Sequence, residues 1–192
     1  MATVATQAQR PVRPRRRRKI NEEEFKRLLI EGKKVELIDG EVHEVPTGAK
    51  HGEIAAHLIR RMPATILRTG RLYDSSVGFR MANGNIRSPD VSYMLKSRLP
   101  EGQSPHDLAD GAPDLAVEII FPSERLSDVL GKVADYFESG AQQVWLLFPE
   151  KQQVVVYRSP FDSVVLNRDD ELTGGDLLPD FRCPVRELFE LD

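Results

Sequence analysis

Three short segments place charged side chains where an apolar strand or helix is expected. They are Ser88-Pro89-Asp90-Val91, residues 112–120 and residues 127–132. In the second segment, Glu118 stands between Ala116-Val117 and Ile119-Ile120, a pattern typical of a buried strand. A carboxylate in such a place is costly unless it binds a cation or takes up a proton. Glu118 is therefore the first candidate for chemistry.

Asp90 is the natural partner of Glu118. If the strands that begin near Ser88 and Pro113 are neighbours, both carboxylates can share one face and offer the hard oxygen ligands that Mg²⁺ prefers. In phosphodiester cleavage, a metal polarises the phosphoryl oxygen and helps to generate hydroxide, while a nearby lysine stabilises the charge of the transition state. Lys132, on the next expected helix, is a candidate for that lysine.

The same residues also have a purely structural interpretation. Pro-Asp pairs often begin strands or turns, and Asp128 with Lys132 is an ordinary i,i+4 ion pair of a helix. Asp114 shares the expected face of Glu118 and could be a further ligand. An aspartate that follows proline at the start of a strand more often caps the backbone, so both interpretations stay open.

Other enzyme classes have little support. His51 and His57 could act as a metal ligand or a proton carrier, but neither belongs to a His-x-x-x-His pattern that indicates zinc. The serines lack the Gly-x-Ser-x-Gly context of a hydrolase nucleophile, and no glycine-rich phosphate loop precedes a helix.

Length and composition indicate one ordinary domain. The chain has 192 residues, of which 40% are hydrophobic and 30% charged. Its single cysteine, Cys183, excludes an internal disulfide and a thiolate zinc cage, and favours a reducing compartment. No apolar run approaches the ~20 residues of a membrane span, and no secretory signal is evident. We therefore expect a cytoplasmic protein without membrane contact.

Charge is divided unevenly along the chain. Residues 1–19 hold seven Arg or Lys and no acid, which leaves 20 basic against 30 acidic side chains in residues 20–192. We expect residues 1–19 to be a disordered, arginine-rich tail. The basic residues 10–19 could attract nucleic acid or could simply solubilise the chain.

Hydrophobic periodicity and turn residues predict a mixed sheet flanked by helices, of the α/β or mixed α+β class. Asn21 with Glu24 resembles a capping box, and Asp39-Gly40 predicts a type I′ hairpin. Residues 159–192 are a weakly patterned annex. The expected helices lie after Asn21, over 51–67 with Pro63 kinking or shortening the helix, and over 125–139; the expected strands are 35–38, 41–45, 72–80, 88–95, 113–121, 144–148 and 154–157.

The order and spacing of several segments resemble a known family. These segments are residues 35–41, His51, Ser88-Pro89-Asp90-Val91, residues 112–123, Asp128 with Lys132, and residues 136–145. Over residues 20–158, they resemble the Uma-two family of bacterial restriction endonucleases, formerly a domain of unknown function, in the PD-(D/E)XK nuclease superfamily.

This resemblance implies a restriction-endonuclease-like core in which Asp90 and Glu118 hold Mg²⁺, with Mn²⁺ as an alternative ion. It also implies a supporting acidic role for Glu41, together with Glu36, and a place for His51 near the site. The sequence departs from the superfamily pattern at the usual lysine position, which is Ile120 here. Lys132 would replace that lysine from the helix.

The departure extends to the segment after the strand, where Phe121-Pro122-Ser123 replaces the Ser-Pro-Ser of the family. Any contact made by the first serine is therefore missing. The sequence thus predicts a Mg²⁺-dependent DNA endonuclease in which Asp90 and Glu118 bind metal, Lys132 steadies the phosphate, and Glu41 or His51 assists water.

The alternative is a catalytically inactive module that binds nucleic acid or a protein partner on the same scaffold. In that case the arginine-rich tail would supply the affinity for DNA. A homodimer is plausible in the nuclease case, because cutting both strands of a duplex is simplest with two symmetric sites.

Overall fold

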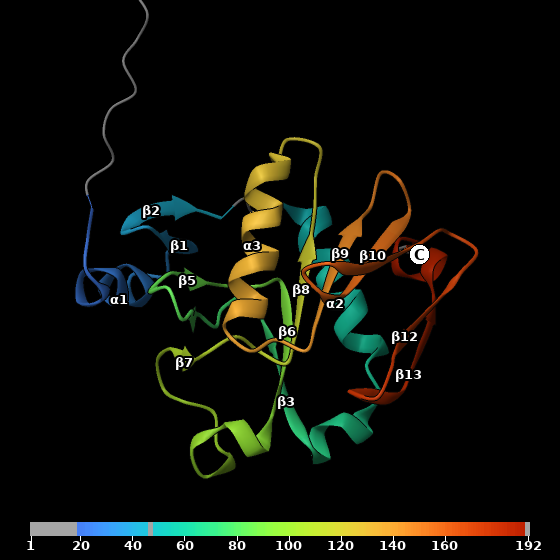
Figure 1. Ribbon diagram of the computed structural model, residues 1–192, viewed down its shortest axis with the longest axis horizontal. Coiled ribbons are helices and arrows are strands. Elements are labelled where there is room, and N and C mark those ends of the chain that lie inside the picture. Colours follow the sequence, from blue (N-terminus) through green and yellow to red (C-terminus); the bar gives the residue numbers. More distant parts are fainter. Residues whose placement is uncertain (1–18, 46–47, 191–192) are drawn as a thin grey trace, which may run out of the picture.

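The structure of the protein, a computed structural model, describes residues 19–45 and 48–190. The arginine-rich segment expected to be disordered lies almost wholly outside these residues, and only Lys19 of it is described. Two β-sheets and a small two-stranded sheet are combined with helices, which makes the fold a mixed α+β arrangement, as the sequence predicted (Figure 1).

A six-stranded sheet forms the centre of the molecule, with one long helix on each face (Figure 1). Its strands, in spatial order, are β11 (Asp162–Leu166), β10 (Gln153–Ser159), β9 (Gln143–Phe148), β8 (Leu115–Ile119), β6 (Val91–Leu95) and β3 (Gly70–Asp74). The helices of the described residues are α1 (Glu22–Ile30), α2 (Ala49–Arg61) and α3 (Leu126–Glu138), with 3-10 turns η1 (Ala64–Arg68), η2 (Lys96–Arg98), η3 (Pro100–Gly102) and η4 (Val185–Leu188).

A five-stranded sheet lies beside the six-stranded sheet, and the chain passes from one to the other between β5 and β6. Its spatial order is β2 (Glu41–Glu44), β1 (Val35–Ile38), β5 (Ile86–Arg87), β4 (Phe79–Arg80) and β7 (Ala109–Asp110). The β1–β2 hairpin turns at Asp39 and Gly40, which have φ of 51° and 79°. Positive φ at both central residues is the signature of the type I′ turn that Asp-Gly predicted.

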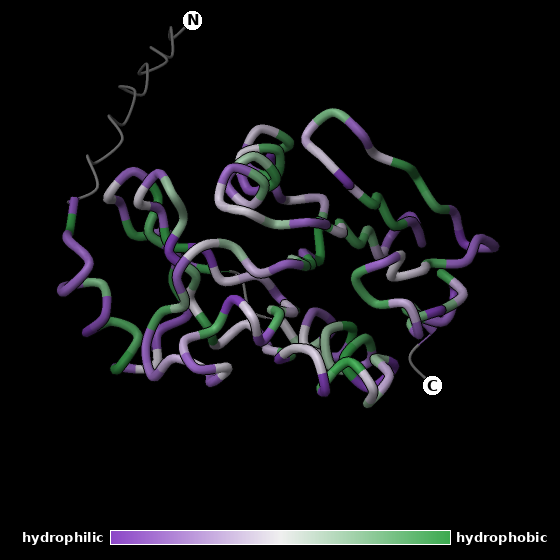
Figure 2. The backbone as a smooth tube through the Cα atoms, turned by 60° about the horizontal axis from the view of Figure 1, so that its bottom comes forward, coloured by the Kyte–Doolittle hydropathy of each residue, from purple (hydrophilic) through white to green (hydrophobic). Residues whose placement is uncertain are grey.

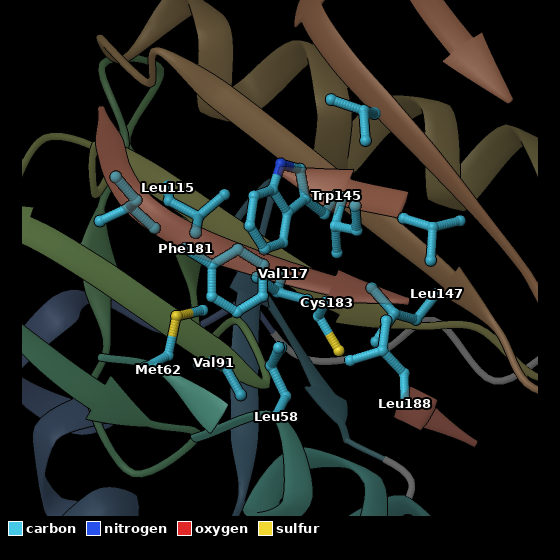
Figure 3. Packing of buried hydrophobic residues seen from close by; sticks show 14 of the residues in the cluster. Leu58, Met62, Val91, Leu115, Val117, Trp145, Leu147, Phe181, Cys183 and Leu188 are labelled. Atoms are coloured by element: carbon cyan, nitrogen blue, oxygen red, sulfur yellow. The ribbon is translucent and has the colours of Figure 1, made fainter. Parts of the chain in front are cut away.

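Alternating side chains of β8 explain why the central sheet has two apolar faces. Leu115, Val117 and Ile119 pack toward α2, where Trp145 and Phe181 meet at a ring-centroid distance of 5.4 Å (Figure 3). Ala116 faces the other way, toward α3. Along the whole backbone, hydrophobic stretches follow hydrophilic ones (Figure 2). On the α3 face, Glu118 is the acid that this strand buries.

Two sequence predictions need correction. The stretch 72–80 is not one strand, because β3 ends at Asp74 and the chain crosses to the other sheet, where β4 and β5 form a hairpin around Asn83-Gly84. The helix expected over 51–67 spans Ala49–Arg61, and η1 follows. Of the two effects expected from Pro63, the structure therefore shows shortening.

The segment 159–192 was expected to be a weakly patterned annex, but its described part belongs to the core. It supplies β11, the two-stranded sheet of β12 (Glu171–Gly174) and β13 (Leu178–Pro184), and η4. Leu172, Phe181 and Leu188 are fully buried against the α2 face. Their alternation does not stand out in the sequence, because β11 is almost wholly exposed and a register shift at Thr173 and Gly174 interrupts the pairing of β12 with β13.

Candidate active site

Strand pairing brings the two predicted acids together. Strands β6 and β8 are antiparallel, with Val91 opposite Val117, so continuing the register by one residue places Asp90 opposite Glu118. Residues opposite each other on antiparallel strands have Cβ atoms about 4.5–5.5 Å apart. Both acids are only 3% exposed. The pairing of these two strands, which was the condition for the expected site, is therefore present in the fold.

Asp90 is fixed by contacts to one of its oxygens. Its Oδ2 accepts the backbone N–H of Ile119 at 2.7 Å and lies 3.1 Å from Nε2 of His51. His51 is in the first turn of α2 and stacks against Phe121. The contact with Asp90 raises the pKa of His51, against the opposing effect of burial. Within the described part of the chain, Oδ1 of Asp90 has no hydrogen-bond donor and is the oxygen available to a ligand.

Glu118 is held at both oxygens by side chains of α3. Oε2 is 2.7 Å from Nζ of Lys132, and Oε1 accepts the hydroxyl hydrogen of Tyr136 at 2.5 Å. Burial raises the pKa of Glu118 to about 7, against the opposing charge of Lys132 and with the help of the negative charge of Asp90. Burial also raises the pKa of Tyr136, which keeps its hydroxyl a donor.

Lys132 lies between two acids. Its Nζ is 2.7 Å from Oε2 of Glu118 and 4.0 Å from Oε1 of Glu36. Burial alone would lower the pKa of Lys132, but the carboxylates of Glu118 and Glu36 outweigh it and raise the pKa. With Asp90 also nearby, three carboxylates surround one ammonium group. Arg87 pairs with Glu36 at 3.1 Å. Asp90 and Glu118 are therefore the two acids that share Lys132, and a further cation beside them is favoured when both are ionised.

Glu36 belongs to a buried polar network beneath the site. Its Oε1 accepts the backbone N–H of Ser88 at 3.1 Å, and its Oε2 accepts a hydrogen bond from Arg87 at 3.1 Å. Arg87 in turn donates to Asp135 of α3 at 2.7 Å. The Ser88-Pro89-Asp90 segment is thus tied to the five-stranded sheet and to α3 together.

Sequence reasoning missed Tyr136, Arg87 and Asp135 as members of this cluster. By its spacing Tyr136 belongs to the apolar stripe of its helix, and it also packs there. For Asp135 a signal was present, since Asp128, Lys132 and Asp135 recur at the i, i+4, i+7 spacing of one helix face, whereas nothing in the sequence singled out Arg87. That face lines the cleft described next.

A polar cleft of about 590 Å³ opens beside the cluster, between α3 and the five-stranded sheet. Lys132 and Glu36 lie at its base, and Gly131 leaves a gap in its wall, since an added Cβ there would meet nothing within 4 Å. Further polar residues of its lining include His43 of β2, Asn83 of the β4–β5 turn, Ser123 and Arg125 before α3, and Ser127 in its first turn.

The remaining sequence candidates lie elsewhere. Glu41 begins β2 opposite Ile38, and its backbone forms an isolated β-bridge with Lys19. Among the described residues no hydrogen bond or ion pair joins Glu41 to Asp90, Glu118 or Lys132. His43, not Glu41, stands opposite Glu36 on the hairpin.

Asp114 and His57 also lie away from the cluster. Asp114 is at the other end of β8, where its Oδ2 accepts the backbone N–H of Leu95. His57 contacts Arg61 on α2. Of the two interpretations left open for Asp114, the backbone cap is therefore the one the structure shows.

The donor set suits a hard divalent cation, with one obstacle. Carboxylate oxygens of Asp90 and Glu118 on adjacent strands are ligands of the kind that Mg²⁺ and Mn²⁺ take. Yet within residues 19–45 and 48–190 no three His, Cys, Asp or Glu side chains converge as a ready metal site. Both Glu118 oxygens are occupied by Lys132 and Tyr136. The residue types fit the ion, but Lys132 is a competing cation at Glu118.

The mixed α+β fold of this chain is shared with a solved structure. The crystal structure described as "a putative nuclease belonging to DUF820 from Anabaena variabilis ATCC 29413" is similar, with a TM-score of 0.73, 23% sequence identity, and coverage of 82% of this chain and 90% of that chain. At this identity the likeness shows the fold alone.

Family membership follows from the sequence match. The chain belongs to the Uma2 family, described as "Putative restriction endonuclease", which it matches over residues 22–186. The match extends well beyond residue 158, where the sequence motifs ended, and covers most of the carboxy-terminal segment. Comparison with curated proteins gave no significant match. None of the helices in the described residues has the length and apolar character needed to cross a bilayer.

Proposed function

We propose that this protein is a metal-dependent endonuclease that hydrolyses phosphodiester bonds of DNA in the cytoplasm. Membership of a restriction endonuclease family supports this proposal. The observation that carries it is the meeting of two buried acids, Asp90 and Glu118, at adjoining strands, with Lys132 in direct contact with Glu118. These acids would hold Mg²⁺ or Mn²⁺, which when bound would polarise the phosphate and activate water.

The protein residues have separate tasks in this proposal. Lys132 stays charged and can stabilise the negative charge that develops on the phosphate. His51 orients Asp90 and, with its raised pKa, can exchange a proton near the attacking water. The role of Glu41 stays a prediction without a contact to support it.

A matched set of variants tests the proposal. We expect the wild-type chain to nick supercoiled DNA in Mn²⁺ or Mg²⁺ and to stop when the metal is chelated. Asp90→Asn and Glu118→Gln should each lower the nicking rate at least 100-fold while thermal unfolding stays cooperative. Glu138→Gln, an exposed acid on the same helix as Lys132, is the control and should cut like wild type.

Equal nicking by wild type and both site variants would show that a contaminant cuts the DNA, and would reject the proposal. Metal-independent binding without any cleavage would favour the inactive binding module. A two-fold dimer would place two sites on one duplex, and sedimentation of the protein with and without DNA tests that part of the proposal.

We propose that the arginine-rich residues 10–19 add non-specific affinity for DNA. Most such affinity comes from phosphate neutralisation and falls steeply with salt. A chain that starts at residue 20 should bind duplex DNA more weakly at low salt than the full chain, with a shallower salt dependence. Fluorescence anisotropy across a salt series measures both slopes, and identical slopes would leave the tail without this role.

A further inference from the structure

The starting observation is that both oxygens of Glu118 already accept a hydrogen bond from α3. Lys132 contacts Oε2 at 2.7 Å, and Tyr136 donates to Oε1 at 2.5 Å. The ammonium group therefore lies at the carboxylate where a divalent cation would be expected. A cation bound at Oε2 would lie beside this ammonium group, and the repulsion between the two positive charges favours moving Lys132 away from it.

A second carboxylate stands within reach of Lys132. Oε1 of Glu36 is 4.0 Å from Nζ, and Glu36 is 4% exposed. Glu36 itself is held firmly, because the N–H of Ser88 and the guanidinium of Arg87 bind its two oxygens. A short movement of a flexible lysine side chain would exchange one buried carboxylate partner for another.

Charge makes this exchange favourable only when a metal arrives. A buried ammonium group that loses its carboxylate partner is strongly disfavoured. Moving toward Glu36 avoids that loss, and the incoming cation replaces the ammonium at Glu118. Glu36 has no other evident reason to face Lys132, since Arg87 already balances its charge.

We propose that Lys132 has two positions, and that metal binding at Asp90 and Glu118 moves its ammonium group from Glu118 toward Glu36. Glu36 is then a positioning residue that acts through Lys132. This inference rests on the proposed metal site. It explains how Glu118, whose Oε2 is now paired with Lys132, can become a metal ligand.

The test is Mn²⁺ binding, measured by calorimetry at pH 8 on the full chain. Lys132→Met removes the competing ammonium group, so Mn²⁺ should bind at least tenfold more tightly than to wild type. Glu36→Gln removes the second position but keeps an acceptor for the N–H of Ser88, so Mn²⁺ should bind about tenfold more weakly. Glu138→Gln should bind like wild type.

The double variant separates positioning from a structural role or direct metal binding. In the Lys132→Met background there is no ammonium group to place, so Glu36→Gln should no longer change the affinity for Mn²⁺. An equal loss in both backgrounds would overturn the inference, because Glu36 would then act on the metal or the fold directly. Unchanged or weaker binding by Lys132→Met alone would also overturn it.

Near-ultraviolet circular dichroism of each variant reports whether the fold is intact. If Glu36→Gln fails to fold, the Lys132→Met result still decides. Failure of this inference differs from failure of the proposed function. A wild-type chain that cleaves DNA while Lys132→Met binds Mn²⁺ no better rejects the two positions and keeps the nuclease. A chain that shows the expected binding pattern but never cleaves rejects the nuclease and keeps the two positions.

Discussion

Two Pro-Asp pairs stand at opposite ends of the same pair of strands, and their surroundings differ. Asp90 precedes β6 and accepts the N–H of Ile119 at the end of β8, at 2.7 Å. Asp114 precedes β8 and accepts the N–H of Leu95 at the end of β6, at 2.8 Å. Each aspartate therefore closes the end of the partner strand in the same way.

The second oxygen distinguishes them. Oδ1 of Asp114 accepts from Gln142 at 2.7 Å and pairs with Arg98 at 3.1 Å, so both of its oxygens are occupied. Asp90 has His51 and Glu118 for neighbours and keeps one oxygen without a donor among the described residues. A local motif thus sets the backbone cap, and residues from distant segments decide which cap can also do chemistry.

Exchanging the two aspartates for asparagine gives the largest expected difference. Asp90→Asn should lower metal-dependent nicking at least 100-fold, whereas Asp114→Asn should leave it within threefold of wild type. Asp114→Asn should instead lower the free energy of unfolding by about 1–3 kcal/mol, because an amide cannot satisfy all three donors around a fully buried carboxylate. Urea unfolding and plasmid nicking measure the two effects; equal loss of nicking in both variants would erase the distinction.

The pH dependence of stability sharpens the same comparison. In metal-free protein the pKa of Glu118 is about 7, above its ordinary 4.5, so the unfolded chain releases this proton first. Stability should therefore fall as pH rises from about 4.5 to 7, by at most about 3 kcal/mol at roughly 1.4 kcal/mol per pKa unit. His51, with its pKa also raised, adds a loss above pH 6.5.

Glu118→Gln should remove the fall below pH 6.5 and leave the later one. Asp114→Asn, at the other end of the strand, should keep both. Urea unfolding at fixed pH steps in chelator provides the measurement. A wild-type profile that is flat or rising over this interval would show that Glu118 is ionised throughout.

The smallest expected effect concerns Glu41, the acid to which the family resemblance gave a supporting role. Because it makes no contact with Asp90, Glu118 or Lys132 among the described residues, Glu41→Gln should change the nicking rate less than twofold. The assay is the same as for Asp90→Asn. A tenfold loss would instead support the assisting role and would require the β1–β2 hairpin to move toward the cluster.

Much of the core was predictable, since Asp39-Gly40, the Asn21 cap and the apolar periodicity act locally. The crossing of the chain at Asp74 was not, because strand pairing depends on distant partners. The Arg87–Asp135 contact was hidden for the same reason: each looks like a solvated charge in its own segment, and only the folded chain brings the two together. Glu118 could be found because its apolar neighbours in the sequence already indicate a buried strand, where a carboxylate is unfavourable without a partner.

Gly131 lines the cleft one residue before Lys132, so the side chain at this position sets the width of the cleft there. Helical glycine costs about 1 kcal/mol relative to alanine, yet here there is free space for a methyl group. Progressively larger side chains at this position should favour the helix while they narrow the cleft. The smallest side chain that blocks a substrate would then report how much room that substrate needs.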